Sequence, residues 1–85
     1  MTTIQYIIKD ELGIHARPAG LLVKECKKFD SEIKIGCKDK FVDAKRIIGV
    51  MGLSVKQDDE ITVTFDGVDE KEAAEEIEKF LNANL

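Results

Sequence analysis

One stretch decides how this chain folds: Leu12-Gly13-Ile14-His15-Ala16-Arg17-Pro18-Ala19-Gly20-Leu21. It holds the only histidine and the only proline of the chain. Apolar residues continue from it at the spacing of one helix face, namely Ala19, Leu22, Val23, Cys26 and Phe29. Proline is tolerated in the first turn of a helix, because its missing N–H would have no intrahelical partner there. We therefore predict a helix from Ala16 to Lys28, with His15 at or just before its N-terminus.

The position of His15 has chemical consequences. The first N–H groups of a helix have no backbone acceptor and lie at the positive end of the helix dipole, where a phosphate or carboxylate binds well. Arg17 adds a cation whose forked donors match phosphate oxygens. The positive field disfavours the imidazolium form, so we expect His15 to be neutral near pH 7 and able to act as a nucleophile. This arrangement fits a transient phosphohistidine, and it fits equally well a surface histidine that caps the helix weakly.

A resemblance to a known family separates these two interpretations. The segment Gly13-Ile14-His15-Ala16-Arg17-Pro18-Ala19 resembles the active-site signature of HPr, the histidine phosphocarrier of the phosphoenolpyruvate:sugar phosphotransferase system. Residues 47–53 resemble the short helix that follows the third strand of that family, and residues 65–70 resemble the entry to its last helix. The likeness covers nearly the whole chain, and the histidine motif is its specific part.

The resemblance implies a phosphocarrier rather than a stand-alone enzyme. HPr accepts a phosphoryl group from enzyme I on Nδ1 of the histidine that matches His15, and passes it to a sugar-specific enzyme IIA. Arg17 and the N–H groups at the helix start, that of Ala16 included, are then expected to balance the phosphate charge, without a metal or a cofactor. Partner contacts in the family fall at positions that here are Gly20, Leu21, Lys24, Lys27, Ile47, Ile48, Met51 and Gly52.

Arg46 departs from the family pattern. Many HPr proteins of Gram-positive type carry a serine here that a dedicated kinase phosphorylates, and arginine has no hydroxyl, so we expect this regulatory switch to be absent. Three alternatives are a nitrogen-branch phosphocarrier with other partners, a regulatory docking protein that carries no phosphate, and an enzyme acting on a small phosphate ester. His15 and Arg17 argue against the docking protein. The enzyme is disfavoured because no second acid–base group is evident beside His15.

Alternating apolar and polar residues predict four strands, at residues 2–9, 32–37, 41–43 and 60–66, the middle two joined as a hairpin. Helical spacing predicts a short helix at 46–53 and a last helix from Glu70 to about Asn82, with Asp69 and Glu72 forming a capping box. The short helix is too small to bury Ile47, Ile48 and Met51 together, and such an exposed apolar patch often marks a docking site. The order β-α-β-β-α-β-α predicts an α+β open-faced sandwich, a four-stranded antiparallel sheet with three helices packed on one face.

Length and composition bound the remaining possibilities. Eighty-five residues suffice for one small domain, which we assign to residues 1–85, and 44% hydrophobic with 35% charged residues is ordinary for a globular chain. Cys26 and Cys37 lack metal-ligand spacing, so we expect them to be reduced core residues. Neither a targeting segment nor a run of transmembrane length is present, so we expect a cytoplasmic protein without membrane insertion, and a monomer.

Charge is segregated along the chain. Residues 1–56 carry eleven Lys and Arg against seven Asp and Glu, whereas residues 57–85 carry two against ten. The basic part contains His15, which suits acidic protein partners or anionic ligands. The net charge of −4 and the scarcity of aromatic residues near the basic clusters argue against nucleic acid as a partner.

Overall fold

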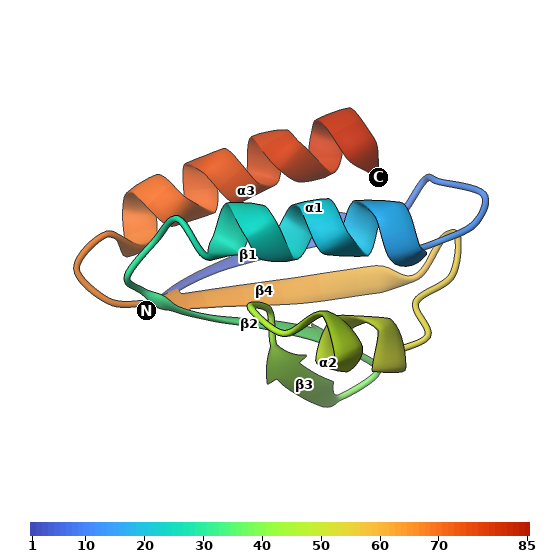
Figure 1. The fold of residues 1–85 in the computed structure, drawn as a ribbon, viewed down its shortest axis with the longest axis horizontal. Helices are drawn as coiled ribbons and strands as arrows, with labels where there is room; N and C mark the ends of the chain where they lie inside the picture. The colour runs from blue at the N-terminus through green and yellow to red at the C-terminus, as the bar shows by residue number, and fades with distance from the viewer.

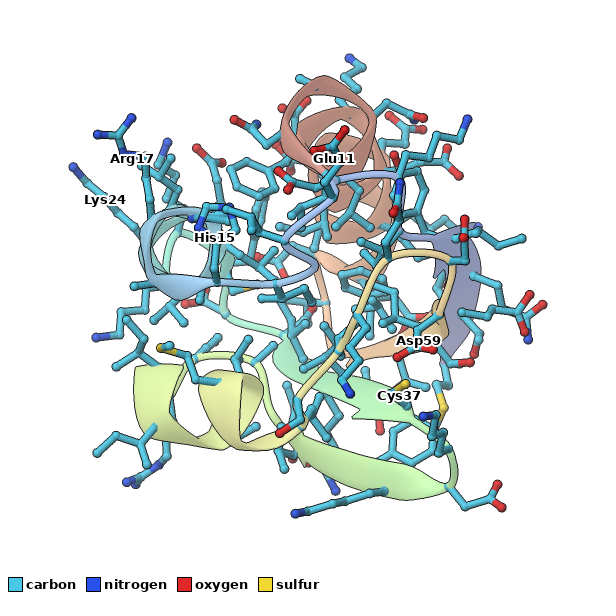
Figure 2. The ribbon with its side chains drawn as sticks, turned by 90° about the vertical axis from the view of Figure 1, so that its right-hand side faces the viewer. Glu11, His15, Arg17, Lys24, Cys37 and Asp59 are labelled. Carbon is cyan, nitrogen blue, oxygen red and sulfur yellow. The ribbon has the colours of Figure 1, made fainter.

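The computed structural model describes residues 1–85 and confirms the predicted order of elements (Figure 1). The elements are β1 (Thr2–Ile7), α1 (Ala16–Cys26), β2 (Glu32–Cys37), β3 (Lys40–Asp43), α2 (Ile47–Gly52), β4 (Glu60–Asp66) and α3 (Glu70–Asn84). The strands form one antiparallel sheet in the order β1-β4-β2-β3. Figure 1 shows α1 and α3 running side by side over this sheet, with α2 next to β3. When the molecule is turned by 90°, the three helices lie on one side of the twisted sheet (Figure 2).

The core lies between the sheet and the helices. On β4 the predicted alternation is confirmed, since Ile61, Val63 and Phe65 are buried while the residues between them are not. Val63 is flanked by Ile4 of β1 and Ile35 of β2, so one layer of branched side chains runs across three strands. The opposite face of the sheet is not covered by any helix, and Ile7 on it is half exposed.

Several predicted boundaries are shifted by one or two residues: β3 begins at Lys40 rather than Phe41, and α2 covers Ile47–Gly52 rather than residues 46–53. β1 ends at Ile7 rather than Lys9, because the N–H groups of Lys9 and Asp10 donate to the carbonyl of Leu85 (2.7 and 2.9 Å) instead of to a strand. α1 ends at Cys26 rather than Lys28, because the N–H of Phe29 donates to the carbonyl of Cys26 in a tighter turn that stops the helix. Phe29 consequently only borders the core instead of being buried in it.

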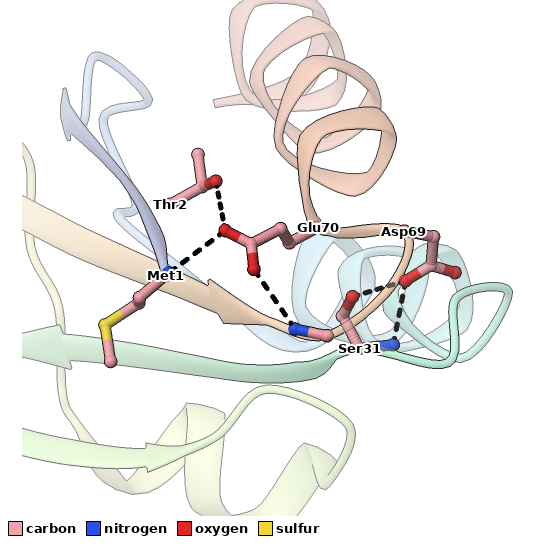
Figure 3. Close-up of polar contacts among 6 residues, drawn as sticks. Met1, Thr2, Ser31, Asp69 and Glu70 are labelled. Carbon is pink, nitrogen blue, oxygen red and sulfur yellow. Dashed lines mark hydrogen bonds and ion pairs between the residues drawn. The ribbon is translucent and has the colours of Figure 1, made fainter.

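The predicted capping box at α3 is wrong. Asp69 holds the N-cap position, but its side chain makes no capping hydrogen bond. It accepts instead from the Asp30 N–H at 2.8 Å. It also accepts from both the N–H and the hydroxyl of Ser31, which joins the start of α3 to the start of β2 (Figure 3). The neighbouring Glu70, rather than Glu72, reaches back to the preceding backbone, where it accepts from the N–H of Gly67 at 3.3 Å.

Glu70 also ties α3 to the first strand. Its second carboxylate oxygen accepts from the Thr2 hydroxyl at 2.6 Å and lies 3.2 Å from the terminal ammonium of Met1 (Figure 3). From this anchored start α3 continues to Asn84, two residues beyond the predicted end.

The two cysteines are free and buried, which confirms them as reduced core residues. Burial raises the pKa of the Cys26 thiol to about 12, and burial also raises the pKa of Cys37, so both are protonated at neutral pH. None of the helices is long and apolar enough to cross a membrane.

Candidate functional site

His15 is the N-cap residue of α1, as predicted. Its backbone is extended (φ −105°, ψ −176°), and its carbonyl accepts the first helical hydrogen bond from Ala19 at 3.0 Å. Its imidazole makes no capping hydrogen bond, so the interpretation of a weak helix cap is wrong. Since Pro18 has no N–H, the unpaired donors of the first turn are those of Ala16 and Arg17, and both residues are exposed.

The loop before His15 is held against the loop after α2. Gly13 has a φ of +67°, and a Cβ atom added to it would lie 2.1 Å from the carbonyl oxygen of Val55. This close approach lets the Ile14 N–H donate to the same carbonyl at 3.1 Å. Ile14 is buried, so its neighbour His15 is presented at the surface from a fixed backbone.

Asp10 is the site residue that sequence reasoning missed. Its Oδ2 atom lies 3.6 Å from Nε2 of His15, which corrects the expectation that no acid–base group stands beside the histidine. The two side chains are 30% and 37% exposed. The Oδ1 atom of Asp10 accepts from the Leu12 N–H at 2.9 Å, which is a local aspartate turn. That turn chemistry was the only signal in the sequence, and it does not reveal that the chain folds back toward His15.

The guanidinium group of Arg17 is unpaired. It forms no ion pair and no hydrogen bond within the chain, and the same holds for the ammonium groups of Lys24 and Lys27. Figure 2 shows His15 at the start of α1, with Arg17 and Lys24 extending outward from the same helix. The site therefore combines an accessible imidazole, two free backbone donors and an unpaired positive charge.

A mixed apolar and basic face adjoins His15 across α1 and α2. A Cβ atom on Gly20 would lie 3.7 Å from Cδ1 of Ile47, which shows how closely the two helices approach. Ile48 is 86% exposed, and Leu21, Ile47 and Met51 are each about 40% exposed. A groove of about 510 Å³ lies beside them, lined by Val23, Lys27, Lys45, Arg46, Ile47, Ile48 and Gly49. The structure thus brings α1 and α2 together at Gly20 and Ile47, and the groove places Lys27 beside Ile47 and Ile48.

Arg46 is the N-cap residue of α2, also as predicted. Its side chain makes no capping hydrogen bond and is 82% exposed. Its Nε atom lies 3.8 Å from the Asp43 carboxylate, a surface ion pair of small energetic weight. Nowhere in the structure do three His, Cys, Asp or Glu side chains come together in a way that could hold a metal ion.

Comparison with known proteins decides the family. The family described as the phosphorylation site of the HPr component of the phosphotransferase system matches residues 2–83. The chain belongs to the HPr family. It is 42% identical over 85 residues to the phosphocarrier protein HPr of Mycoplasma genitalium, a match that covers 99% of this chain and 97% of the relative.

Solved HPr structures have the same fold. A histidine-containing phosphocarrier protein from Mycoplasma superposes with a TM-score of 0.94 at 38% identity, covering 96% of this chain and 93% of the other. An HPr from Thermoanaerobacter tengcongensis superposes with a TM-score of 0.93 at 36% identity, covering 98% and 93%. These matches confirm the open-faced sandwich, and they confirm the phosphocarrier role in the phosphotransferase system that the resemblance implied.

Proposed function

We propose that His15 carries the phosphoryl group, and that it does so on Nδ1. One observation carries the proposal: the imidazole stands at a helix start where the N–H groups of Ala16 and Arg17 are unpaired. A phosphoryl group on this ring adds negative charge at the positive end of the helix dipole. The Arg17 side chain supplies further compensation without a competing carboxylate partner.

In the transfer step, the Nδ1 lone pair of neutral His15 attacks the phosphorus atom of a phosphohistidine on the donor protein. The new N–P bond forms while the N–P bond of the donor breaks, and the donor nitrogen leaves with the bonding electron pair. The second transfer is the same exchange with His15 as the leaving group. Such a reaction depends on positioning and charge compensation, and much of it requires a partner that excludes water.

Radiolabel transfer tests this proposal. The protein is incubated with labelled phosphoenolpyruvate, Mg²⁺ and enzyme I, and acid-labile label is expected at one equivalent. His15→Ala should take up none, because the chain has no other histidine. Acid-stable label in the wild type, or label retained by His15→Ala, would contradict the assignment of His15.

We further propose that enzyme I and enzyme IIA dock on the face around His15. That face combines the unpaired cations of Arg17, Lys24 and Lys27 with exposed apolar side chains, whereas α3 is rich in acids. The proposed contact residues are Gly20, Leu21, Lys24, Lys27, Ile47, Ile48, Met51 and Gly52. The carrier is proposed to act in the cytoplasm. It is also proposed to act as a single chain of one domain, because every group of the site comes from one copy.

Charge and apolar substitutions separate the two surfaces. Met51→Glu should weaken binding to enzyme I by about tenfold, because it places an unpaired charge in an apolar contact. Lys24→Glu should weaken binding and reduce its salt dependence. Glu75→Lys on α3 is the matched control and should bind as the wild type does. Calorimetric titration at two salt concentrations measures all three, and a larger loss in Glu75→Lys than in the other two would place the docking face elsewhere.

The arginine at position 46 removes one form of control from the proposed carrier. Without a hydroxyl there, an HPr kinase has no acceptor, and the guanidinium adds a lasting positive charge to the groove beside α2. We therefore expect a carrier that is not switched off by phosphorylation at this position.

A further inference from the structure

We propose that Asp10 is a positioning residue, which holds the His15 ring with its proton on Nε2 and so makes Nδ1 the reacting nitrogen. The inference rests on the proposed role of His15 as the phosphoryl carrier. It starts from the approach of Asp10 Oδ2 to His15 Nε2 at 3.6 Å. No other side chain of the protein forms a hydrogen bond or an ion pair with this ring.

Asp10 is itself held in place by the surrounding backbone. Its Oδ1 atom accepts from the Leu12 N–H at 2.9 Å, its carbonyl accepts from the Gly13 N–H at 2.9 Å, and its own N–H donates to the Leu85 carbonyl at 2.9 Å. One carboxylate oxygen is therefore occupied, and Oδ2 is the one that remains to face the imidazole. A carboxylate fixed in this way is preorganised toward the ring rather than free to swing into solvent.

A neutral imidazole carries its proton on one nitrogen and a lone pair on the other, and the acceptor beside it decides which. A carboxylate next to Nε2 favours the Nε2–H form, which leaves the lone pair on Nδ1. The distance of 3.6 Å is beyond a good hydrogen bond. Hydrogen bonds of this kind are often long in the free protein and shorten in the reacting complex.

The same protonation state of the ring serves both directions of transfer. When Nδ1 takes the phosphoryl group and Nε2 keeps its proton, the ring gains a positive charge, and Asp10 lies close enough to compensate it. When the phosphoryl group moves on, the N–P electron pair returns to Nδ1 and the ring leaves as neutral imidazole. No proton has to move in either step.

Asp10→Asn tests this proposal, with Glu11→Gln as the control. If the Asn side-chain oxygen keeps the Leu12 N–H, its NH₂ group faces Nε2, and a donor replaces an acceptor. Glu11→Gln removes one negative charge from the neighbouring position of the same loop, where the side chain is exposed and makes no hydrogen bond. ¹⁵N chemical shifts of the ring in alkaline buffer report which nitrogen is protonated. Phosphoramidate, a small donor with an N–P bond, measures the phosphorylation rate without a partner protein.

In the wild type and in Glu11→Gln we expect the Nε2–H form to dominate and the rates to agree. In Asp10→Asn we expect the population to shift toward Nδ1–H and the rate to fall about two- to fivefold, the factor for a partly exposed charge pair. Unchanged exchange of the Leu12 and Gly13 amide protons in Asp10→Asn shows that the loop is intact. Wild-type tautomer and rate in Asp10→Asn, or an equal change in Glu11→Gln, would overturn the proposal. Failure of the wild type to be phosphorylated would instead overturn the carrier role of His15, while the tautomer measurement still decides the role of Asp10.

Discussion

At the scale of single residues, Gly13 controls where His15 stands. Any side chain at its φ of +67° is strained, and a Cβ atom would overlap the Val55 carbonyl at 2.1 Å. Gly13→Ala should therefore push the two loops apart and lower the free energy of unfolding by roughly 2–4 kcal/mol. Urea unfolding measures the loss. The rate of phosphorylation should fall as well, because the Ile14–Val55 hydrogen bond that fixes the loop is lost.

Gly52→Ala is the matched control for that substitution. Gly52 lies in the last turn of α2, and a Cβ atom there meets nothing within 4 Å. Alanine should raise stability by up to about 1 kcal/mol, because it lowers the entropy that the unfolded chain loses. A loss of stability in Gly52→Ala as large as that in Gly13→Ala would show that contact with the Val55 loop is not the reason Gly13 matters.

At the scale of elements, α2 is a helix of six residues that begins without a cap. Arg46 offers no short acceptor to the free N–H groups, and its cation opposes the helix dipole. Arg46→Ser should stabilise the protein by about 0.5–2 kcal/mol. For a domain of this size the melting temperature then rises by roughly 4–8 °C per kcal/mol. Calorimetry checks the shift. Arg46→Ala removes the cation without adding an acceptor, so a gain equal to that of serine would assign the effect to charge rather than to capping.

At the scale of the whole molecule, two carboxylates at the start of α3 join segments that are far apart in the chain. The Ser31 hydroxyl, followed by the Asp30 N–H, lowers the pKa of Asp69 below its ordinary value of 3.8. The Thr2 hydroxyl, followed by the Gly67 N–H, lowers the pKa of Glu70 below its ordinary value of 4.5. As the pH falls, the unfolded chain therefore binds protons before the folded one does. Stability is complete above the unfolded values and is lost as the pH falls through the folded ones.

We accordingly expect the free energy of unfolding to decline below roughly pH 5. Asp69→Asn should be less stable at neutral pH, because the charge-assisted hydrogen bonds from Asp30 and Ser31 are weakened, and its decline with acid should be shallower. Glu75→Gln removes a carboxylate of the same helix that makes no hydrogen bond, and its decline should parallel that of the wild type. Urea titrations between pH 3 and 7 measure the three slopes. Equal slopes in all three proteins would show that Asp69 is not the cause of the loss of stability in acid.

The sequence by itself determined the elements of this protein, their order and the position of His15. These features depend on interactions between residues no more than about four positions apart: strand alternation, helical spacing and the placement of proline in a first turn. His15 at the start of α1 and Arg46 at the start of α2 could both be read in this way. The free N–H groups of Ala16 and Arg17 follow directly from the placement of His15 at the start of α1.

Only the tertiary structure decided what surrounds those residues. Asp69 accepts hydrogen bonds from Asp30 and Ser31, which lie 38 or more positions away in the chain, instead of capping its own helix. No local sequence pattern distinguishes these two uses of a carboxylate. The proposed docking face depends on the packing of α1 against α2 at Gly20 and Ile47. Asp10 is only five positions from His15, yet its approach requires Gly13 at positive φ, and the Val55 loop holds it there. The local sequence allows several turn conformations here, and packing against a distant segment selects one of them.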